Sequence, residues 1–174
     1  MIQLFKLKTL LIVLICFSIS ACGFHLRGTD SIGNDKIVYI DAPHGTFEQQ
    51  LSDDLRISGA QLSNVAGDSD WHIKVSQAQL SRDIGTLNER GTVDSYKLNF
   101  TVSYSVLDSE GKLIKAPQTL TETRQYIFNP AAIVESESEE EALRLGMEKE
   151  LSLRIIRHLS ALNTSENSTA LNAK

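Results

Sequence analysis

The pattern that most limits the possible folds of this chain is a strict alternation of side chains over residues 96–106. Apolar side chains occupy every second position, namely Tyr96, Leu98, Phe100, Val102, Tyr104 and Val106. Polar or charged side chains occupy the positions between them, namely Lys97, Asn99, Thr101, Ser103 and Ser105. A period of two predicts a β-strand with one buried face and one solvated face. The fold must therefore cover one side of a sheet.

Neighbouring segments predict the other strands of that sheet. Trp71, Ile73 and Val75 alternate with polar residues, so a strand is expected over residues 71–80. The polar segment 81–92 predicts a hairpin loop, and residues 108–111 predict a turn. The chain then returns as a strand over residues 112–128, in which Pro117 indicates an edge position or a bulge. A β-rich run over residues 36–42 predicts one more strand.

Two helices are expected, over residues 47–58 and 138–162. Each has a potential capping box at its start, Thr46 with Gln49 and Ser138 with Glu141. Gly59 follows the first helix, where a left-handed C-terminal residue is common. Both helices have an apolar stripe, which in the second consists of Leu143, Met147, Leu151, Ile155, Leu159 and Leu162.

The predicted order is β-α-β-β-β-α, in the α+β class. A four-stranded, mostly antiparallel sheet with both helices packed on one face forms a two-layer sandwich, which buries every apolar stripe. The opposite sheet face carries Ser, Thr, Asn and Lys and is a candidate interaction surface. Residues 22–162 are expected to form one domain, and the Ser-, Thr- and Asn-rich residues 163–174 are predicted to be disordered.

The N-terminus has the layout of a bacterial export signal. Lys6 and Lys8 precede an uncharged apolar stretch over residues 9–19, which is too short to span a membrane. The following Ile19, Ser20, Ala21 and Cys22 resemble the lipobox of bacterial lipoproteins. We expect residues 1–21 to be removed and Cys22 to carry an S-diacylglycerol and an N-linked palmitate.

The alternative is an ordinary cysteine beside a plain signal peptide. Gly23 follows the cysteine, where an aspartate would resemble the signal for retention in the inner membrane. An outer-membrane location, with the domain facing the periplasm, is therefore expected.

The composition limits the function classes. Without Lys6 and Lys8, the expected mature chain has 15 basic and 22 acidic side chains, which argues against general nucleic-acid binding. Cys16 lies inside the signal, so no disulfide is expected within the mature chain.

Motifs for catalysis or metal binding are missing from the sequence. It has no Gly-rich phosphate loop, Cys pair, zinc-binding His motif or Gly-x-Ser-x-Gly elbow. The four histidines share no spacing, and the acidic run over residues 135–141 lacks the pattern of a calcium loop. We therefore predict no enzyme activity, no metal and no cofactor beyond the covalent lipid on Cys22.

The basic residues near the predicted loops are candidates for binding an anion. Arg82 and Arg90 flank the predicted hairpin loop, and Lys112 and Lys115 follow the opposite turn. The planar fork of arginine suits phosphate groups, which are abundant on lipopolysaccharide at the outer membrane. The alternative is that all four are ordinary surface charges.

The residues after the lipobox resemble the start of the mature lipoproteins of the LptE (RlpB) family. The matching residues are Cys22, Gly23, Phe24, His25, Leu26 and Arg27, followed by Gly28. The order of elements and the run from Tyr126 to Pro130 are also similar to the family. The resemblance implies a non-catalytic protein that plugs the large LptD β-barrel, assists its assembly and binds lipopolysaccharide during delivery to the cell surface.

The resemblance also suggests which residues contact lipopolysaccharide. The family is thought to use basic side chains near the end of the sheet, and here Arg90 is the first candidate, with Arg82 and Arg124 as further ones. Residues 131–141 depart from that pattern, because they supply only acids. Which surface contacts the barrel is left open.

Two other functions are compatible with an exported lipoprotein. The first is a free-standing carrier of a small amphiphile, or an accessory to another envelope transporter, and a deep apolar pocket between sheet and helices would favour it. The second is an envelope hydrolase, for which the sequence offers no nucleophile with a visible base.

Overall fold

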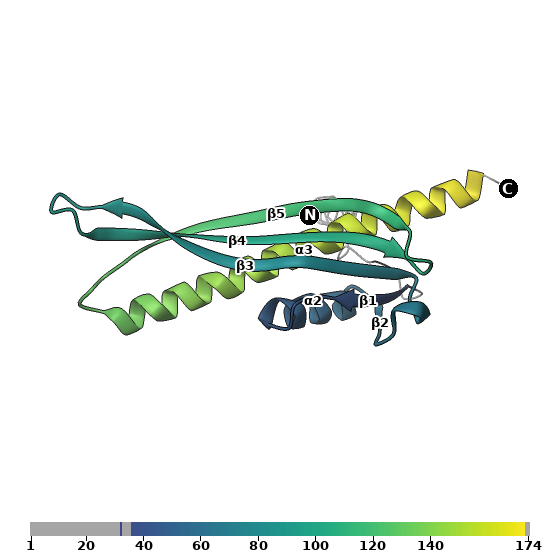
Figure 1. The fold of residues 1–174 in the computed structure, drawn as a ribbon, viewed down its shortest axis with the longest axis horizontal. Coiled ribbons are helices and arrows are strands. Elements are labelled where there is room, and N and C mark those ends of the chain that lie inside the picture. Colours follow the sequence, from purple (N-terminus) through teal and green to yellow (C-terminus); the bar gives the residue numbers. More distant parts are fainter. Residues whose placement is uncertain (1–31, 33–35, 173–174) are drawn as a thin grey trace, which may run out of the picture.

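The structure of the chain is a computed structural model that describes residue 32 and residues 36–172. It contains one five-stranded mixed sheet with the strand order β2-β1-β3-β4-β5. The strands are β1 (Ile37–Asp41), β2 (Gln61–Ser63), β3 (Trp71–Leu87), β4 (Val93–Asp108) and β5 (Leu113–Ile127). β1 runs parallel to β2 and β3, whereas β3, β4 and β5 form an antiparallel meander (Figure 1).

The alternation in the sequence corresponds to the two faces of β4. Leu98, Phe100, Val102, Tyr104 and Val106 are buried, whereas the residues between them are half-buried or exposed. We call the buried side the helix-side face, because the helices cover it. The prediction of a strand with one covered face is confirmed.

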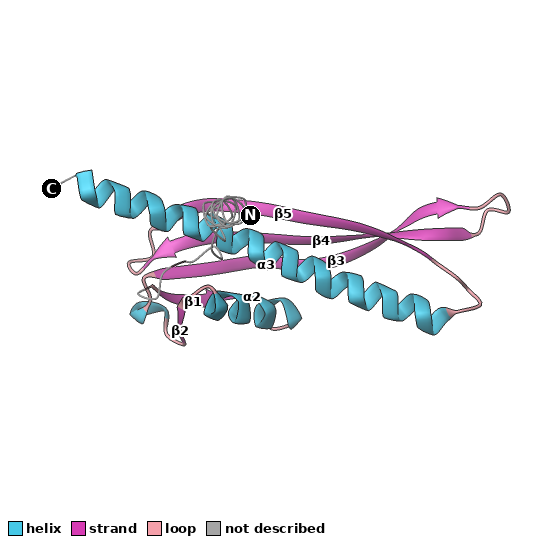
Figure 2. Ribbon diagram, turned by 180° about the vertical axis from the view of Figure 1, so that it is seen from behind, coloured by secondary structure: helices cyan, strands magenta, loops and turns pink. Residues whose placement is uncertain are grey.

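Two α-helices pack on the helix-side face. They are α2 (Thr46–Ile57) and α3 (Ile133–Asn172), and Figure 2 shows α3 crossing in front of β3, β4 and β5. A short 3-10 helix, η1 (Ala66–Asp68), precedes β3. The α3 stripe is fully buried at Met147, Leu151, Ile155 and Leu159, and the Phe47 ring of α2 lies 5.8 Å from that of Phe100. The two-layer α+β sandwich is therefore confirmed.

The strand count and pairing need correction. The predicted sheet has four mostly antiparallel strands, but β2 adds a fifth strand and two of the four pairings are parallel. β2 has only three residues, which is too short to show a periodic pattern. It is held as a strand by its parallel register with β1, where Ile37 pairs with Gln61 and Tyr39 with Ser63.

The hairpin loop predicted over residues 81–92 is mostly strand. β3 continues to Leu87, so that only residues 88–92 connect it to β4. Residues 81–87 are exposed on both faces, and the strand is maintained there by backbone pairing with β4. Polarity indicated solvent exposure correctly but did not distinguish a loop from an exposed ribbon.

Neither predicted capping box forms. The N-cap of α2 is Gly45, without a side-chain cap, and the Thr46 hydroxyl instead donates to Glu148 Oε1 at 2.9 Å. α3 begins at Ile133, so Ser138 and Glu141 lie inside the helix. The helix also continues to Asn172, through residues for which the sequence predicts a disordered tail.

Two predicted chain breakers lie where the sequence places them. Gly59 has φ of 96° just after α2, a left-handed conformation that favours glycine. Pro117 lies in the edge strand β5, within a register shift between the pairs Tyr104–Gln118 and Val106–Lys115. Proline cannot donate a ladder hydrogen bond, and this position does not require one.

Candidate functional site

The lipid-attachment residue and the family motif lie outside the described residues. Cys22 and the motif residues Gly23, Phe24, His25, Leu26 and Arg27 therefore remain predictions. Within the described residues, no helix is long and apolar enough to cross a membrane.

The face of the sheet opposite the helices is covered by short polar side chains. Their hydroxyl and amide groups form hydrogen bonds across the strands, at 3.1 Å between Thr101 and Thr121 and at 2.9 Å between Ser103 and Thr119. The Thr123 hydroxyl donates to Asn99 Oδ1 at 2.9 Å. We call the surface formed by these six residues the polar sheet face. Its cross-strand bonds hold these short side chains in fixed positions.

Arg90 lies in the turn between β3 and β4, at the end of the longest hairpin (Figure 1). The side-chain oxygen of Asn88 accepts hydrogen bonds from the backbone N–H groups of Arg90 and Thr92, at 3.0 and 3.1 Å. Gly91 completes the turn with φ of 74°. Within the described residues, the exposed guanidinium of Arg90 makes no ion pair, so it is available to a ligand.

The sequence predicts that Arg82 and Arg90 lie on either side of one hairpin loop. In the structure, Arg82 does not lie at that loop. It lies within β3, where its guanidinium is 2.9 Å from Glu140 of α3 and 4.7 Å from the centre of the Tyr96 ring. The hydroxyl of Tyr126 donates to the same carboxylate at 2.5 Å. The hydrogen bond with Glu140 raises the pKa of Arg82, and burial, with the bond to Glu140, raises the pKa of Tyr126 to about 12. Arg82 thus attaches the start of α3 to the sheet.

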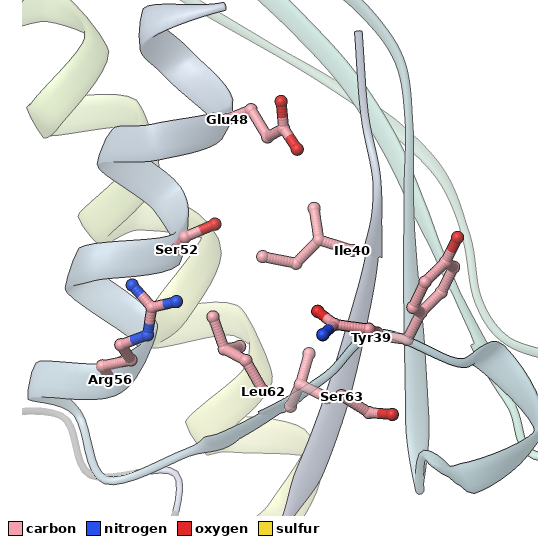
Figure 3. A pocket seen from close by; sticks show the side chains of 9 residues that line it. Tyr39, Ile40, Glu48, Ser52, Arg56, Leu62 and Ser63 are labelled. Carbon is pink, nitrogen blue, oxygen red and sulfur yellow. The ribbon is translucent and has the colours of Figure 1, made fainter. Parts of the chain in front are cut away.

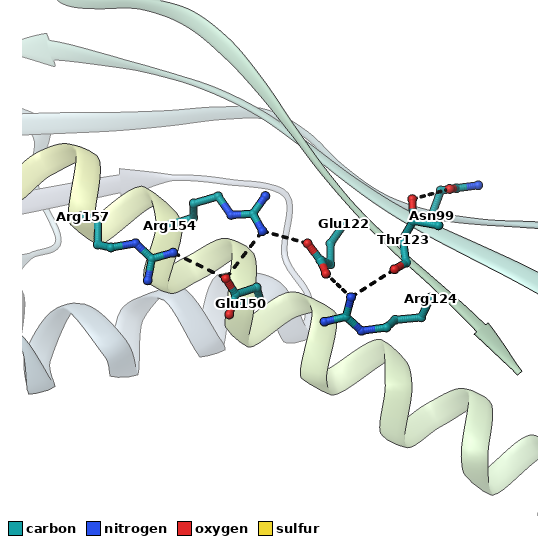
Figure 4. Close-up of polar contacts among 7 residues, drawn as sticks. All are labelled: Asn99, Glu122, Thr123, Arg124, Glu150, Arg154 and Arg157. Atoms are coloured by element: carbon teal, nitrogen blue, oxygen red, sulfur yellow. Dashed lines mark hydrogen bonds and ion pairs between the residues drawn. The ribbon is translucent and has the colours of Figure 1, made fainter.

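Arg124 is also engaged within the protein (Figure 4). It binds the Glu122 carboxylate and donates to the Thr123 carbonyl at 3.1 Å. The other Glu122 oxygen lies 2.8 Å from Arg154 of α3. Arg154 and Arg157 both contact Glu150 at about 3.5 Å, so the network connects β5 to α3.

The structure brings two of the three predicted lipopolysaccharide residues into one row of the sheet. Arg82 and Arg124 pair with Leu98 from either side, on the helix-side face. Arg90 lies apart from them in the turn. Among the described residues, Arg82 pairs with Glu140 and Arg124 with Glu122, whereas Arg90 has no carboxylate partner.

A groove of about 280 Å³ lies between α2 and the strands β1 and β2 (Figure 3). Glu48, Ser52 and Arg56 line it from α2, opposite Tyr39 and Ile40. The groove is open and mostly polar, unlike the deep apolar pocket expected of an amphiphile carrier. Between the helices and the sheet, buried apolar side chains form one continuous core.

Among the described residues, no three His, Cys, Asp or Glu side chains form a cluster that could hold a metal ion.

Comparison with known proteins identifies the family. Residues 36–159 match the family model LptE, described as lipopolysaccharide-assembly. The chain belongs to the LptE family. An LPS-assembly lipoprotein LptE of Pectobacterium atrosepticum is 26% identical over 165 residues, which cover 92% of this chain and 89% of that protein. One from Photorhabdus laumondii is 22% identical, with 95% and 91% covered.

Solved structures of bacterial lipoproteins share the LptE-like fold. Lipoprotein B of Nitrosomonas europaea superposes with a TM-score of 0.71 at 29% identity, over 82% of this chain and 93% of that chain. A minor lipoprotein of Acinetobacter baumannii gives a TM-score of 0.61, also at 29% identity, over 72% and 91%. Rare lipoprotein B of Shewanella oneidensis gives 0.59 at 19% identity over 79% and 98%, a likeness of fold alone.

The exposed apolar residues at the end of the long hairpin were missed by the sequence reasoning. Ile84 and Leu87 are 60% and 55% exposed within the segment interpreted as a polar loop. The presence of two large apolar residues in an otherwise polar segment was the sequence signal that could have indicated this exposed apolar surface.

Proposed function

We propose that this protein is an outer-membrane lipoprotein that occupies the lumen of the LptD barrel, helps the barrel to assemble, and binds lipopolysaccharide during its delivery to the cell surface. Its membership of the LptE family gives the general role, in lipopolysaccharide assembly. The barrel partner, the outer-membrane location and the ligand are the proposal. No catalytic step is part of this function.

The observation that carries the proposal is the polar sheet face. The lumen of a large barrel is itself polar, and a plug must present polar groups to it. The polar sheet face does so with short side chains already fixed by hydrogen bonds, for example between Thr101 and Thr121. Little side-chain entropy is then lost when this surface meets a second protein.

The filled core favours a structural role over the alternative function, a carrier of a small amphiphile. A carrier of a small amphiphile needs an enclosed apolar cavity. Here the space under the sheet is occupied by side chains such as Trp71, Met147 and Leu151, which are at most 1% exposed. The groove beside α2 is polar and open, and it does not replace such a cavity.

Co-purification tests the proposal. Full-length lipoprotein extracted in detergent should carry the LptD barrel in a stable complex, and depletion of the lipoprotein should leave the barrel misassembled. If the lipoprotein is recovered alone and the barrel folds normally without it, the proposal fails.

A pair of variants tests the role of the polar sheet face. Thr121→Arg places a long charged side chain on that face and should reduce the amount of barrel recovered. Asp53→Arg, at an exposed position of α2, is the matched control and should leave recovery unchanged. Equal recovery with both variants would mean that the barrel contacts another surface.

A further inference from the structure

The β3–β4 hairpin carries apolar side chains at its far end that no described element covers. Ile84 is 60% exposed and Leu87 is 55% exposed, although the same strands are buried under the helices farther back. Figures 1 and 2 show the hairpin extending past the start of α3. The helix-side face therefore continues beyond the helix that covers it.

Two register shifts keep these apolar side chains on one side of the ribbon. Ile84 pairs with Tyr96 and Leu87 pairs with Val93, and the register slips once on either side of Thr86. The first slip adds one extra residue to β3, and the second adds one to β4. Both bulges flank the pair of Thr86 and Ser95, which lies on the opposite face. Ile84 and Leu87 consequently both continue the helix-side face that holds Tyr96.

The first turn of α3 supplies more exposed apolar surface at the same end of the molecule. Ile133 is 53% exposed and Val134 is 74% exposed. Ile133 lies two turns before Glu140, on the side of α3 that meets Arg82 of β3. We call Ile84, Leu87, Ile133 and Val134 the distal apolar surface. Its apolar side chains come from both layers of the sandwich.

The charged side chains at the start of α3, beside this surface, are all negative. Residues 129–141 contain five glutamates and no lysine or arginine. Glu140 pairs with Arg82 and Glu141 pairs with Arg144. Within the described residues, the exposed Glu135, Glu137 and Glu139 make no ion pairs. This rim repels the phosphate groups of a lipid and attracts lysine and arginine.

We propose that the distal apolar surface docks a segment of a partner protein that combines aliphatic side chains with lysine or arginine. This inference rests on the proposed function in one respect only, since the barrel is the first partner to test. The aliphatic side chains would cover Ile84, Leu87 and Ile133, and the cations would meet the three unpaired glutamates. Arg90, in the turn beyond, keeps its separate role toward lipopolysaccharide.

Variants of the full-length lipoprotein, expressed with the LptD barrel and extracted in detergent, test the surface. Leu87→Asp combined with Ile133→Asp should reduce the barrel recovered at least tenfold, and Glu137→Lys combined with Glu139→Lys should do the same. The matched controls are Ile57→Asp, at a residue 75% exposed on α2, and Glu110→Lys in the β4–β5 turn. Both controls should keep wild-type recovery. All the altered side chains are exposed, and thermal melts should confirm that each variant is folded.

Photocross-linking from position 87 identifies the occupant directly. A benzophenone side chain there should cross-link to a protein peptide that contains aliphatic residues and lysine or arginine, whereas the same group at position 57 should not. Such a peptide supports the inference whether or not it belongs to the barrel. An acidic peptide, cross-links to lipopolysaccharide alone, or no cross-link at position 87 would overturn it.

The two proposals can fail separately. If wild-type protein recovers the barrel and the distal variants recover as much, the plug role stands, the barrel is not the occupant of the distal apolar surface, and the cross-linked peptide decides the docking inference. If wild-type protein does not recover the barrel, the plug role is wrong and the cross-linked peptide decides the docking inference.

Discussion

The hydroxyl of Tyr104 on β4 lies 2.6 Å from Nδ1 of His158 on α3. The two rings are stacked with 6.3 Å between their centroids. Burial raises the pKa of Tyr104 to about 12, so the phenol stays neutral at physiological pH. Burial lowers the pKa of His158, as do the charges of Lys115, Arg157 and Arg154. The polar contact between sheet and helix is thus between neutral groups.

This pair predicts a loss of stability in mild acid. The unfolded histidine titrates near 6.5, whereas the folded one takes up a proton only at lower pH. Between these values the unfolded chain binds more protons, so the free energy of unfolding falls as the pH falls below about 6.5. His158→Gln should flatten that part of the profile, measured by thermal melts from pH 7.5 to 5. His44→Gln, at a fully exposed histidine, is the control, and parallel profiles for His158→Gln and wild type would contradict the prediction.

A second prediction concerns the buried carboxylate between the two helices. Glu148 is 2% exposed, and its Oε1 accepts hydrogen bonds from Arg144 at 2.5 Å and from the Thr46 hydroxyl at 2.9 Å. Arg144→Ala leaves that carboxylate without its cation and should cost about 3 kcal/mol in urea unfolding. Arg157→Ala removes a more exposed arginine and should cost less than about 1 kcal/mol. Similar losses for both variants would show that Glu148 does not depend on Arg144.

A third prediction contrasts two glycines. A Cβ at Gly85 would lie 2.5 Å from Ser95 Oγ and 3.2 Å from the Ser95 carbonyl oxygen, so Gly85→Ala must shift the β3 bulge and should cost about 1–3 kcal/mol. Gly146 lies inside α3 with nothing within 4 Å of an added Cβ. Gly146→Ala should therefore stabilise the protein by about 0.5–1 kcal/mol. Chemical denaturation of both variants measures the contrast, and a neutral Gly85→Ala would mean that the bulge adapts freely.

A fourth prediction separates two of the three arginines predicted to contact lipopolysaccharide. Arg90→Glu should weaken binding to lipopolysaccharide micelles severalfold with an unchanged melting temperature, because the side chain is exposed. Arg82→Gln should lower stability by about 1 kcal/mol, through loss of its contacts with Glu140 and Tyr96. Its effect on binding should be the smaller of the two. The opposite ranking, with binding more sensitive to Arg82, would place the ligand beside α3.

The fold was predictable where a periodic pattern extended over several turns or several strand positions. The β4 alternation and the α3 stripe identified the two surfaces that form the core. β2 was not predictable, because three residues carry no period and their pairing depends on β1. The first capping box failed because Thr46 found a tertiary partner in Glu148, which the local sequence does not show, and the second failed because α3 begins at Ile133, before Ser138.

The candidate site was predictable only in part. Sequence could identify Arg82, Arg90 and Arg124 as cations, but not that two of them are occupied by Glu140 and Glu122. That distinction depends on contacts between residues up to 58 positions apart. The exposed Ile84 and Leu87 were hidden for a related reason, since only the three-dimensional fold shows where the covering helix ends.

The outer edge of β5 bears on how the protein behaves before it meets a partner. β5 pairs with β4 on one side, and among the described residues no strand pairs with its other edge; such an edge, 15 residues long, is a template for uncontrolled pairing with other chains. Pro117 interrupts the ladder and Lys115 adds a charge there, while Arg124 occupies the Thr123 carbonyl. These features discourage edge-to-edge pairing with other chains. The free edge of the sheet is therefore a poor template for the addition of a strand from another chain.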